Sequence, residues 1–438
     1  MSRILVIGAG KSGVAASNFL ARRGSAVTIS DQKAEEMLPL AAQLDARVER
    51  SFGDASGRFP EDVESVVLSP GVPPTVPLVM EARRRSVPVI SEIELAFREL
   101  KGRVIAITGS NGKSTTTALT GEILREAGND PVIAGNIGEP LISAVDDRER
   151  AYVVELSSFQ LEAVDRFRAD VAVLLNITPD HMDRYESMEE YAEAKYRIFR
   201  NQNAEDFAVV NADDPRTAHP RTEGRVLSFS SSRPVDQGAF LEGEEMRLVV
   251  DGRSERISRS SLMIPGIANV ENALASWLAA DALGAPREAV ERAFRRFRGL
   301  PHRMVLVREL NGVRYINDSK GTNVDATLKS LEGLRDGSVI LILGGKDKNG
   351  EFERMRDLVA AKTLEVLTIG SAAERIAEAL GDATSILACE TMDEAVRVAS
   401  EHARRGDTVL LSPACASFDQ YDNFEHRGRH FEELVNAL

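Results

Sequence analysis

Residues 104–116 carry the pattern that most limits what this chain can fold into. The apolar run Val104-Ile-Ala-Ile is typical of a buried strand. It leads through Thr108-Gly-Ser-Asn-Gly into Lys113-Ser-Thr-Thr, which predicts the first turn of a helix. In such a strand–loop–helix unit, loop N–H groups and the positive end of the helix dipole point toward a phosphate chain. The pattern therefore predicts an α/β domain that binds a nucleoside triphosphate.

Two side chains of this loop have expected chemical roles. Lys113 would reach the terminal phosphates, and the Ser114 hydroxyl would bind Mg²⁺. The loop is shorter than a standard P-loop, which has a glycine five residues before Gly112, where this chain has Ile107. An ordinary glycine-rich turn is the alternative, but Lys-Ser-Thr in a first helical turn fits phosphate chemistry better.

Length and composition fit a soluble multidomain protein. The chain has 438 residues, 43% hydrophobic and 28% charged, and this length predicts about three domains. The net charge of −14 argues against nucleic acid as a partner. Cys389 and Cys415 form neither a disulfide framework nor a zinc spacing, and no apolar run is long enough for a membrane span. We expect a cytoplasmic monomer without a targeting segment or membrane contact.

Short apolar runs alternate with helical segments along nearly the whole chain, which predicts mainly parallel α/β sheets. We place three domains at 1–93, 94–299 and 300–438. Residues 225–263 differ, because short alternating runs broken by Asp251-Gly252 predict a small antiparallel sheet. The predicted strands are 4–7, 27–30, 66–68, 87–90, 104–107, 152–155, 171–176, 207–211, 225–230, 239–241, 247–250, 254–257, 339–343, 365–369 and 408–411.

A second glycine loop, Gly8-Ala-Gly-Lys-Ser-Gly, follows the first predicted strand, and Asp31 ends the next one. This is the full dinucleotide fingerprint, which by itself suggests NAD or FAD. However, the first domain ends near residue 93, too early for both halves of a dinucleotide fold, and a UDP-sugar would fit the loop equally well. Ser69-Pro-Gly71 follows the third strand, where a ligand contact and a plain turn are equally compatible with the sequence.

Polar residues end two strands of the central domain. Glu155 is a candidate Mg²⁺ ligand, with an exposed strand-end carboxylate as the alternative. Asp180 and His181 follow another strand, where His181 is either a surface residue or a metal ligand. Lys195 lies on a predicted helix, where a solvated lysine is the simplest interpretation.

Three polar loops of the third domain, 317–323, 344–348 and 412–420, each follow a predicted strand. Their lysines and hydroxyls predict a cation-containing site for an anionic substrate at one rim of the sheet. Arg303, at the domain junction, could reach a phosphate. Cys415 is a possible nucleophile, although a small buried thiol fits better because no histidine is near it in sequence.

Together these motifs resemble the Mur ligases along essentially the whole chain. Thr108-Gly-Ser-Asn-Gly-Lys-Ser-Thr has the shortened form of ATP loop found in that family. Glu155-Leu-Ser-Ser-Phe-Gln-Leu-Glu, Asn317-Asp-Ser-Lys-Gly-Thr-Asn and Leu411-Ser-Pro-Ala-Cys-Ala-Ser-Phe-Asp-Gln resemble the branch that adds D-glutamate. The Asp-Asn-Pro-Arg motif of the branches that add meso-diaminopimelate or lysine is not found.

The resemblance implies a Rossmann-like UDP-binding domain, a central P-loop ATPase-like domain and a C-terminal Rossmann-like domain. For the UDP-sugar it implies Gly10, Lys11, Ser12, Asp31, Ser69 and Gly71, with Asn136 and Ser157 facing its muramoyl-alanine portion. For ATP it implies Gly109, Ser110, Asn111, Gly112, Lys113, Ser114, Thr115, Asn272, Arg303 and Asp318. For D-glutamate it implies Lys320, Thr322, Lys348, Ser417 and Phe424. Ser114 and Glu155 would hold one Mg²⁺, and His181 with a carbamylated Lys195 a second.

The implied reaction joins D-glutamate to UDP-N-acetylmuramoyl-L-alanine with ATP. The substrate carboxylate would form an acyl phosphate, which the amine of D-glutamate attacks; Lys113, Glu155, His181 and Lys195 are the implied catalytic residues. The alternatives are an NAD-dependent oxidoreductase, a nucleotide-gated binding protein, and a related ligase such as folylpolyglutamate synthetase. The N-terminal diphosphate loop argues against the folate enzyme.

Overall fold

The structure is a computed structural model that describes residues 3–53 and 59–438. Its internal contacts divide the chain into two units. The first contains Met1–Ile177 and Tyr191–Phe297, and the second contains Thr178–Glu190 and Arg298–Leu438. The short segment Thr178–Glu190 therefore packs with the C-terminal part of the chain, although it lies within the central part of the sequence.

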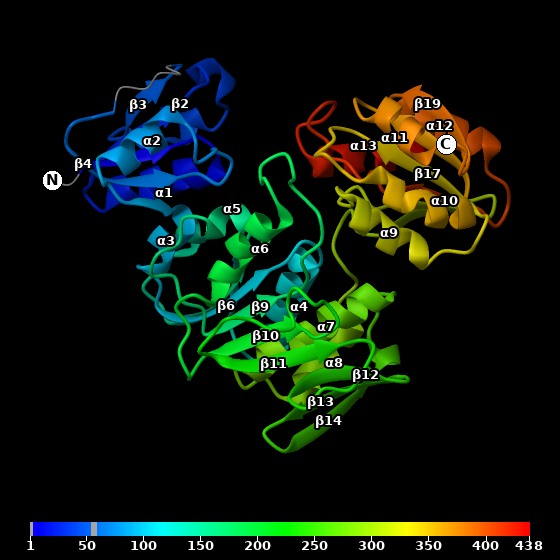
Figure 1. Cartoon of the computed structure of the whole chain (residues 1–438), viewed down its shortest axis with the longest axis horizontal. Helices are drawn as coiled ribbons and strands as arrows, with labels where there is room; N and C mark the ends of the chain where they lie inside the picture. Colours follow the sequence, from blue (N-terminus) through cyan, green and yellow to red (C-terminus); the bar gives the residue numbers. More distant parts are fainter. Residues whose placement is uncertain (1–2, 54–58) are drawn as a thin grey trace. The chain divides into compact units, whose positions relative to one another are not determined.

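The N-terminal part of the first unit contains a five-stranded parallel sheet with the order β3-β2-β1-β4-β5. This part is blue in Figure 1. Leu5 and Ile7 of β1 pack with Leu78 and Val79 of α2 in one buried cluster. The elements are β1 (Arg3–Ile7), α1 (Lys11–Arg22), β2 (Ala26–Asp31), β3 (Glu49–Phe52), β4 (Val63–Leu68), α2 (Pro77–Arg84), β5 (Val89–Ser91) and α3 (Glu92–Phe97).

The central sheet has nine strands in the order β14-β13-β12-β11-β10-β9-β6-β8-β7. Ile105 and Ile107, alternate residues of β6, share a buried cluster with Ile123 of α4 and Trp277 of α7. Its elements are β6 (Gly102–Thr108), α4 (Lys113–Glu126), β7 (Val132–Gly135), β8 (Arg150–Glu155), α5 (Ser158–Leu161), β9 (Val171–Leu174), α6 (Met188–Tyr196), β10 (Phe207–Asn211), β11 (Arg225–Ser230), β12 (Gly238–Glu242), β13 (Glu245–Val250), β14 (Arg253–Ser258), α7 (Ile267–Asp281) and α8 (Arg287–Arg296).

The antiparallel strands expected at 225–263 are present, but they extend the central sheet instead of forming a sheet of their own. β11 pairs in parallel with both β10 and β12, and only β12, β13 and β14 form an antiparallel meander. The alternation of apolar residues in this region predicts the strands correctly, but it does not indicate which neighbour each strand pairs with.

The second unit contains a six-stranded sheet with the order β15-β16-β20-β17-β18-β19. Successive residues of β17 enter different clusters: Ile340 and Ile342 pack with α12 and α13, and Leu341 and Leu343 pack with α9 and α11. Helices therefore cover both faces, as expected for parallel strands. The elements are β15 (Val305–Leu310), β16 (Val313–Asn317), α9 (Val324–Glu332), β17 (Val339–Gly344), α10 (Arg356–Lys362), β18 (Thr363–Ile369), α11 (Ala373–Leu380), β19 (Ser385–Glu390), α12 (Met392–His402), β20 (Thr408–Leu411) and α13 (Phe424–Ala437).

The predicted α/β class with three sheet-containing parts is confirmed, while the exact boundaries 1–93, 94–299 and 300–438 stay a prediction. Four strands were not predicted: β3, β7, β15 and β19, while the strand expected before Asn317 is β16. All four are edge strands of their sheets. No helix in the described part of the chain combines the length and apolar character needed to cross a bilayer.

Glu92 is a buried carboxyl group at the start of α3, where the N-terminal sheet continues into the central part. Its side chain is 1% exposed, and Oε1 accepts a hydrogen bond of 2.6 Å from the N–H of Ile142. Oε2 has no hydrogen-bond partner. Burial raises the pKa of Glu92 to about 7, although the hydrogen bond from Ile142 acts in the opposite direction.

We predict that Glu92 makes the protein less stable as the pH rises. The folded protein retains a proton that the unfolded chain releases near pH 4.5, so stability falls between about pH 4.5 and about pH 7. The contribution is on the order of 3 kcal/mol. Glu92→Gln should flatten the dependence of the thermal unfolding midpoint on pH in this window. Parallel curves for variant and wild type would contradict the assignment.

Candidate functional site

The phosphate loop predicted at 109–114 lies between β6 and α4, with two glycines in conformations that side chains disfavour. Gly109 has φ of +154° and Gly112 has φ of +88°. A Cβ on Gly112 would lie 2.3 Å from Oδ1 of Asn272. Only glycine fits there, because α7 brings Asn272 directly against the start of α4. Asn272, predicted for ATP, therefore adjoins the loop.

Lys113 and Ser114 are the first residues of α4. The Lys113 Nζ donates hydrogen bonds to the carbonyls of Gly109 at 2.8 Å and Ser110 at 2.7 Å, so its ammonium group lies over the loop. Ser114 and Thr115 are buried, which places their hydroxyls at the helix N-terminus. This arrangement concentrates positive potential where a phosphate chain would bind.

Two residues that we did not predict for the site hold the phosphate loop in place. Asn176, after β9, accepts from the Asn111 N–H at 2.8 Å and donates to the Asn111 carbonyl at 3.1 Å. The Asn176 carbonyl also accepts from the N–H of Ser110 at 2.9 Å. The hydroxyls of Ser110 and Tyr191 lie 3.1 Å apart. A polar residue ending a buried strand was the only sequence signal for Asn176.

Glu155 lies at the carboxyl end of β8, the neighbour of β6, with 1% of its surface exposed. Oε1 accepts a hydrogen bond of 2.7 Å from Nδ2 of Asn136, and Oε2 is buried without a hydrogen-bond partner. A buried carboxylate oxygen in this state fits a cation as its missing partner. Asn136 and Ser157, predicted for the muramoyl-alanine portion, lie nearby: Asn136 supports Glu155, and Ser157 caps α5.

Lys195 of α6 lies at the phosphate loop. Its side chain is 1% exposed, and Nζ donates to the Gly109 carbonyl at 2.9 Å. The ammonium group also lies 4.6 Å from the centre of the Tyr191 ring. The interpretation of Lys195 as a solvated helix lysine is therefore wrong, and its implied role as a carbamylated metal ligand stays a prediction.

The N-terminal glycine loop is shaped by its own predicted ligand residues. Asp31 Oδ2 accepts from the N–H of Ala9 at 2.8 Å, and Ser69 Oγ donates to the Gly8 carbonyl at 2.9 Å. A Cβ on Gly13 would lie 1.9 Å from the Gly8 carbonyl oxygen. Gly10 caps α1, Lys11 and Ser12 are its first residues, and Gly71 follows β4. The set gathers at the carboxyl ends of β1, β2 and β4.

In the second unit, Asp180 and Lys348 form an ion pair. Oδ1 of Asp180 lies 2.5 Å from Nζ of Lys348, and Asn323 Nδ2 donates to Oδ2 at 3.1 Å. Burial alone would raise the pKa of Asp180, but the charges of Lys348 and His181 hold it well below its usual range. His181 has φ of +59°, and its Nε2 lies 3.7 Å from Asp180.

Asp318, predicted for ATP, is buried among donors of its own domain. Oδ2 accepts from the hydroxyls of Ser330 at 2.7 Å and Ser412 at 2.8 Å. Burial raises the pKa of Asp318 to about 6, although these hydrogen bonds act in the opposite direction. Arg303 lies one residue after His302, a buried histidine whose Nδ1 is 2.9 Å from Asn317 Nδ2.

Arg427 joins the three polar loops predicted for the amino acid. It is 1% exposed, and its guanidinium donates to the carbonyls of Ser319, Cys415 and Ala416, which belong to the first and third loops. Its contact with the Gly344 carbonyl, at 3.5 Å, reaches the second. Burial lowers the pKa of Arg427 to about 10. Sequence reasoning missed this residue because it lies far along the chain, on α13.

The residues predicted for D-glutamate lie on or beside these loops, all in the second unit. Lys320 Nζ lies 4.4 Å from the centre of the Phe424 ring, and the Thr322 N–H donates to the Lys320 carbonyl at 2.9 Å. Ser417 is buried after β20. Cys415 is fully buried, and burial raises the pKa of its thiol to about 12, which fits a structural thiol and not a nucleophile.

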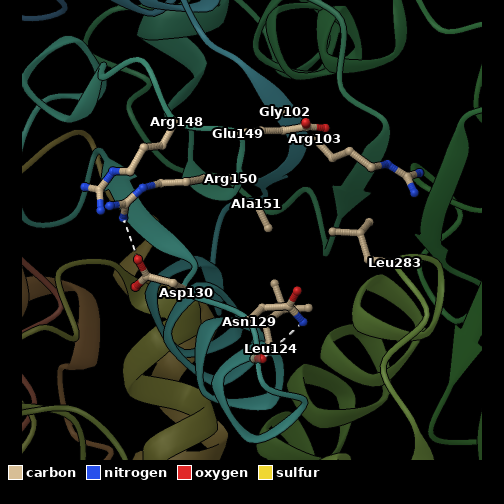
Figure 2. Close-up of a pocket in the computed structure, with 10 residues that line it drawn as sticks. All are labelled: Gly102, Arg103, Leu124, Asn129, Asp130, Arg148, Glu149, Arg150, Ala151 and Leu283. Atoms are coloured by element: carbon tan, nitrogen blue, oxygen red, sulfur yellow. Dashed lines mark hydrogen bonds and ion pairs between the residues drawn. The ribbon is translucent and has the colours of Figure 1, made fainter.

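A cavity of about 310 Å³ lies at the amino ends of β6 and β8 and at the end of α4. Figure 2 shows the arginines that line it around this opening. Ligands of parallel sheets bind at the carboxyl ends of the strands, and the phosphate loop follows the carboxyl end of β6. This cavity lies at the amino ends, so it is separate from the phosphate loop. Each of its arginines has a carboxylate partner: Arg150 with Asp130 at 3.1 Å, Arg148 with Asp146 at 2.7 Å and Arg103 with Asp170 at 3.4 Å.

Comparison with family models assigns almost the whole chain. Residues 2–91 match the Mur ligase MurD-like N-terminal domain, residues 107–280 the Mur ligase middle domain, and residues 302–415 the Mur ligase glutamate ligase domain. Curated proteins named UDP-N-acetylmuramoylalanine–D-glutamate ligase are close relatives. Those of Acidobacterium capsulatum and Solibacter usitatus are both 46% identical, covering 99% and 100% of this chain and 96% and 98% of their own length.

Solved structures share the fold. A pseudomurein peptide ligase type C from Methanothermus fervidus aligns with a TM-score of 0.65 and 19% identity, covering 100% of both chains. The UDP-N-acetylmuramate–alanine ligase of Thermotoga maritima aligns with a TM-score of 0.63 and 20% identity, again over 100% of both chains. A MurF ligase from Thermotoga maritima in complex with ADP gives 0.60 at 18% identity, over 88% of this chain and 99% of that one.

Proposed function

This chain belongs to the Mur ligase family, and we propose that it joins D-glutamate to UDP-N-acetylmuramoyl-L-alanine with ATP. It is an ATP-dependent C–N ligase of peptidoglycan synthesis. The observation that carries the proposal is the phosphate loop with Lys113 over it and the buried Glu155 at the end of the neighbouring strand. The substrates are small molecules, and we propose that the enzyme acts as a cytoplasmic monomer.

In the first step, the carboxylate of the muramoyl-alanine substrate attacks the γ-phosphate of ATP and ADP leaves. Lys113 stabilises the negative charge on the transferred phosphoryl group, and loop N–H groups orient the phosphate chain. The amine of D-glutamate, after losing a proton, attacks the acyl carbon and phosphate leaves. The proposed proton acceptor is His181 or a neighbouring base. Water must be excluded meanwhile, because an acyl phosphate hydrolyses readily.

The residues of the first unit fit a Mg²⁺ ion. Glu155 supplies a buried carboxylate oxygen, and Ser114 supplies a hydroxyl at the helix N-terminus. No group of three or more His, Cys, Asp or Glu side chains forms a metal cluster within residues 3–53 and 59–438. Mg²⁺ does not need one, because it keeps waters and binds substrate phosphates. When bound, it would neutralise phosphate charge and help to align the reacting oxygens.

A second Mg²⁺ is proposed with His181 and a carbamylated Lys195 as ligands. The burial of Lys195 beside the Gly109 carbonyl supports a functional position for this side chain. Carbamylation would convert a buried cation into an anion with oxygen ligands, which a hard cation prefers. Lys320, Thr322, Lys348, Ser417 and Phe424 are proposed for D-glutamate, and Gly10, Lys11, Ser12, Asp31, Ser69 and Gly71 for the UDP-sugar.

The function predicts strict amino-acid selectivity. ADP release should require both UDP-N-acetylmuramoyl-L-alanine and D-glutamate, and L-glutamate, L-lysine and meso-diaminopimelate should give only background. The cationic loops of the second unit match a second carboxylate, which lysine lacks. Equal ADP release without an amino acid would indicate a nucleotide switch and contradict ligation.

For Glu155, we predict that Glu155→Gln raises the Mg²⁺ concentration needed for half-maximal ADP release by about 10-fold or more, because the variant loses the buried negative charge. The measurement is a Mg²⁺ titration at saturating ATP. Glu149→Gln is the matched control, since Glu149 precedes the amino end of the same strand. An unchanged Mg²⁺ requirement in Glu155→Gln would remove the proposed ligand.

For Lys195, we predict that Lys195→Ala lowers the ligation rate by roughly 100-fold, and that a short-chain carboxylic acid restores part of it. The acid would enter the space left by the side chain and replace the carbamate oxygens. Wild type with the same acid is the control. Undiminished activity of the variant would show that Lys195 has no part in the reaction.

A further inference from the structure

The ion pair between Asp180 and Lys348 connects two separate segments of the second unit. Lys348 comes from the loop after β17, and Asp180 comes from the segment Thr178–Glu190. The Asp180 side chain is only 8% exposed, and the Lys348 side chain is only 14% exposed. Both oxygens of Asp180 are engaged, because Asn323 donates to the one that lies farther from Lys348.

Strained backbone surrounds this pair. His181, Asn349 and Ala414 have φ of +59°, +58° and +58°, a region that non-glycine residues rarely adopt. His181 follows Asp180, Asn349 follows Lys348, and Ala414 lines the same small cavity as both charged residues. Strain of this kind persists where the surrounding structure holds it, and it clusters at ligand sites.

The charges limit which ligand this pair can accept. Removing one partner of a buried ion pair is strongly unfavourable, since the other charge is left uncompensated. A carboxylate that took only Lys348 would leave Asp180 buried without the Lys348 ammonium group that contacts it directly. Asp180 would then keep the hydrogen bond from Asn323 and the more distant His181, at 3.7 Å. A zwitterion brings both charges, so it can replace both partners at once.

We propose that the Asp180–Lys348 pair opens to receive the amino acid as a zwitterion, with a carboxylate of D-glutamate on Lys348 and its α-ammonium on Asp180. This inference rests on the proposed role of Lys348 in D-glutamate binding. Asp180 is then a binding and specificity residue that holds the nitrogen destined to attack the acyl carbon. It distinguishes an amino acid from a plain dicarboxylic acid.

Two other roles for Asp180 lead to different expectations. If Asp180 only holds Lys348 in position, loss of Asp180 weakens the binding of every ligand that contacts Lys348. If Asp180 only competes with ligands for Lys348, loss of Asp180 strengthens the binding of every such ligand. The zwitterion role alone requires that ligands with and without an amino group respond in opposite directions.

The test uses Asp180→Asn in the full-length enzyme with two ligands. The KM for D-glutamate is measured by ADP release, together with the inhibition constant of glutarate, which has the same two carboxylates and no amine. We expect the KM to rise about 10- to 100-fold, the effect of losing one charge-assisted hydrogen bond. Glutarate should bind more tightly, because Lys348 no longer has an anionic competitor.

The proposal is overturned if the KM for D-glutamate and the inhibition constant of glutarate change in the same direction. It is also overturned if neither constant changes. Asp407→Asn is a matched control that should leave both constants unchanged. Asp407 is a buried aspartate at the amino end of β20, whereas Lys348 follows the carboxyl end of β17 in the same sheet. If Asp180→Asn does not fold, wild type is tested instead: D-glutamate should then bind more tightly than glutarate, and equal affinity would overturn the proposal.

Lys348→Met separates this inference from the function on which it rests. If Lys348 receives a carboxylate, both D-glutamate and glutarate should bind more weakly to this variant. If the binding of neither ligand changes, the amino-acid site itself is wrongly placed, whatever the result for Asp180→Asn. If both bind more weakly here, while Asp180→Asn changes the binding of both in the same direction, the site stands and only the zwitterion role fails.

Discussion

The approach of Asn272 to Gly112 fixes the nucleotide loop, and the arrangement of the central domain depends on it. The absence of a Cβ lets Asn272 accept a hydrogen bond of 3.2 Å from Thr116, joining α7 to α4. From the other side, Asn176 clamps the loop at the end of β9. The loop is thus held by a strand and a helix that lie far apart in sequence, so its shape does not depend on the bound phosphate to form.

Buried charge distinguishes the functional regions from the rest of the interior. Glu155 has an oxygen without a hydrogen-bond partner, and Arg427 is a buried cation bonded mainly to carbonyls. Such groups cost stability compared with apolar packing, so they persist where they hold ligands or loops. Glu92 shows the same cost outside the site, where burial alone keeps a carboxyl group protonated near neutral pH.

Much of the fold could be predicted because β6, β8, β9 and β17 are continuous apolar runs followed by polar loops. Of the missed strands, β3 lacks that signal because it is the polar run Glu-Arg-Ser-Phe, whereas β7 and β19 have only the short apolar runs Val-Ile-Ala and Ile-Leu-Ala-Cys. Motif residues were found from local sequence, but their supports were not. Asn176, Tyr191 and Arg427 act through contacts distant in sequence, which no local pattern encodes. The true burial of Lys195 depends equally on tertiary packing.

The segment Thr178–Glu190 connects, along the chain, two residues that contact the phosphate loop, and it carries Asp180 between them. It begins directly after Asn176 and Ile177 and ends directly before Tyr191, and Asn176 and Tyr191 both contact the phosphate loop. Its middle carries Asp180, which pairs with Lys348. The proposed change of partner at Asp180 would therefore act on a short segment whose two ends adjoin the loop that we propose for ATP. Since an exchange of ion-pair partners has two discrete states, it is the kind of element through which amino-acid binding and nucleotide binding can influence each other.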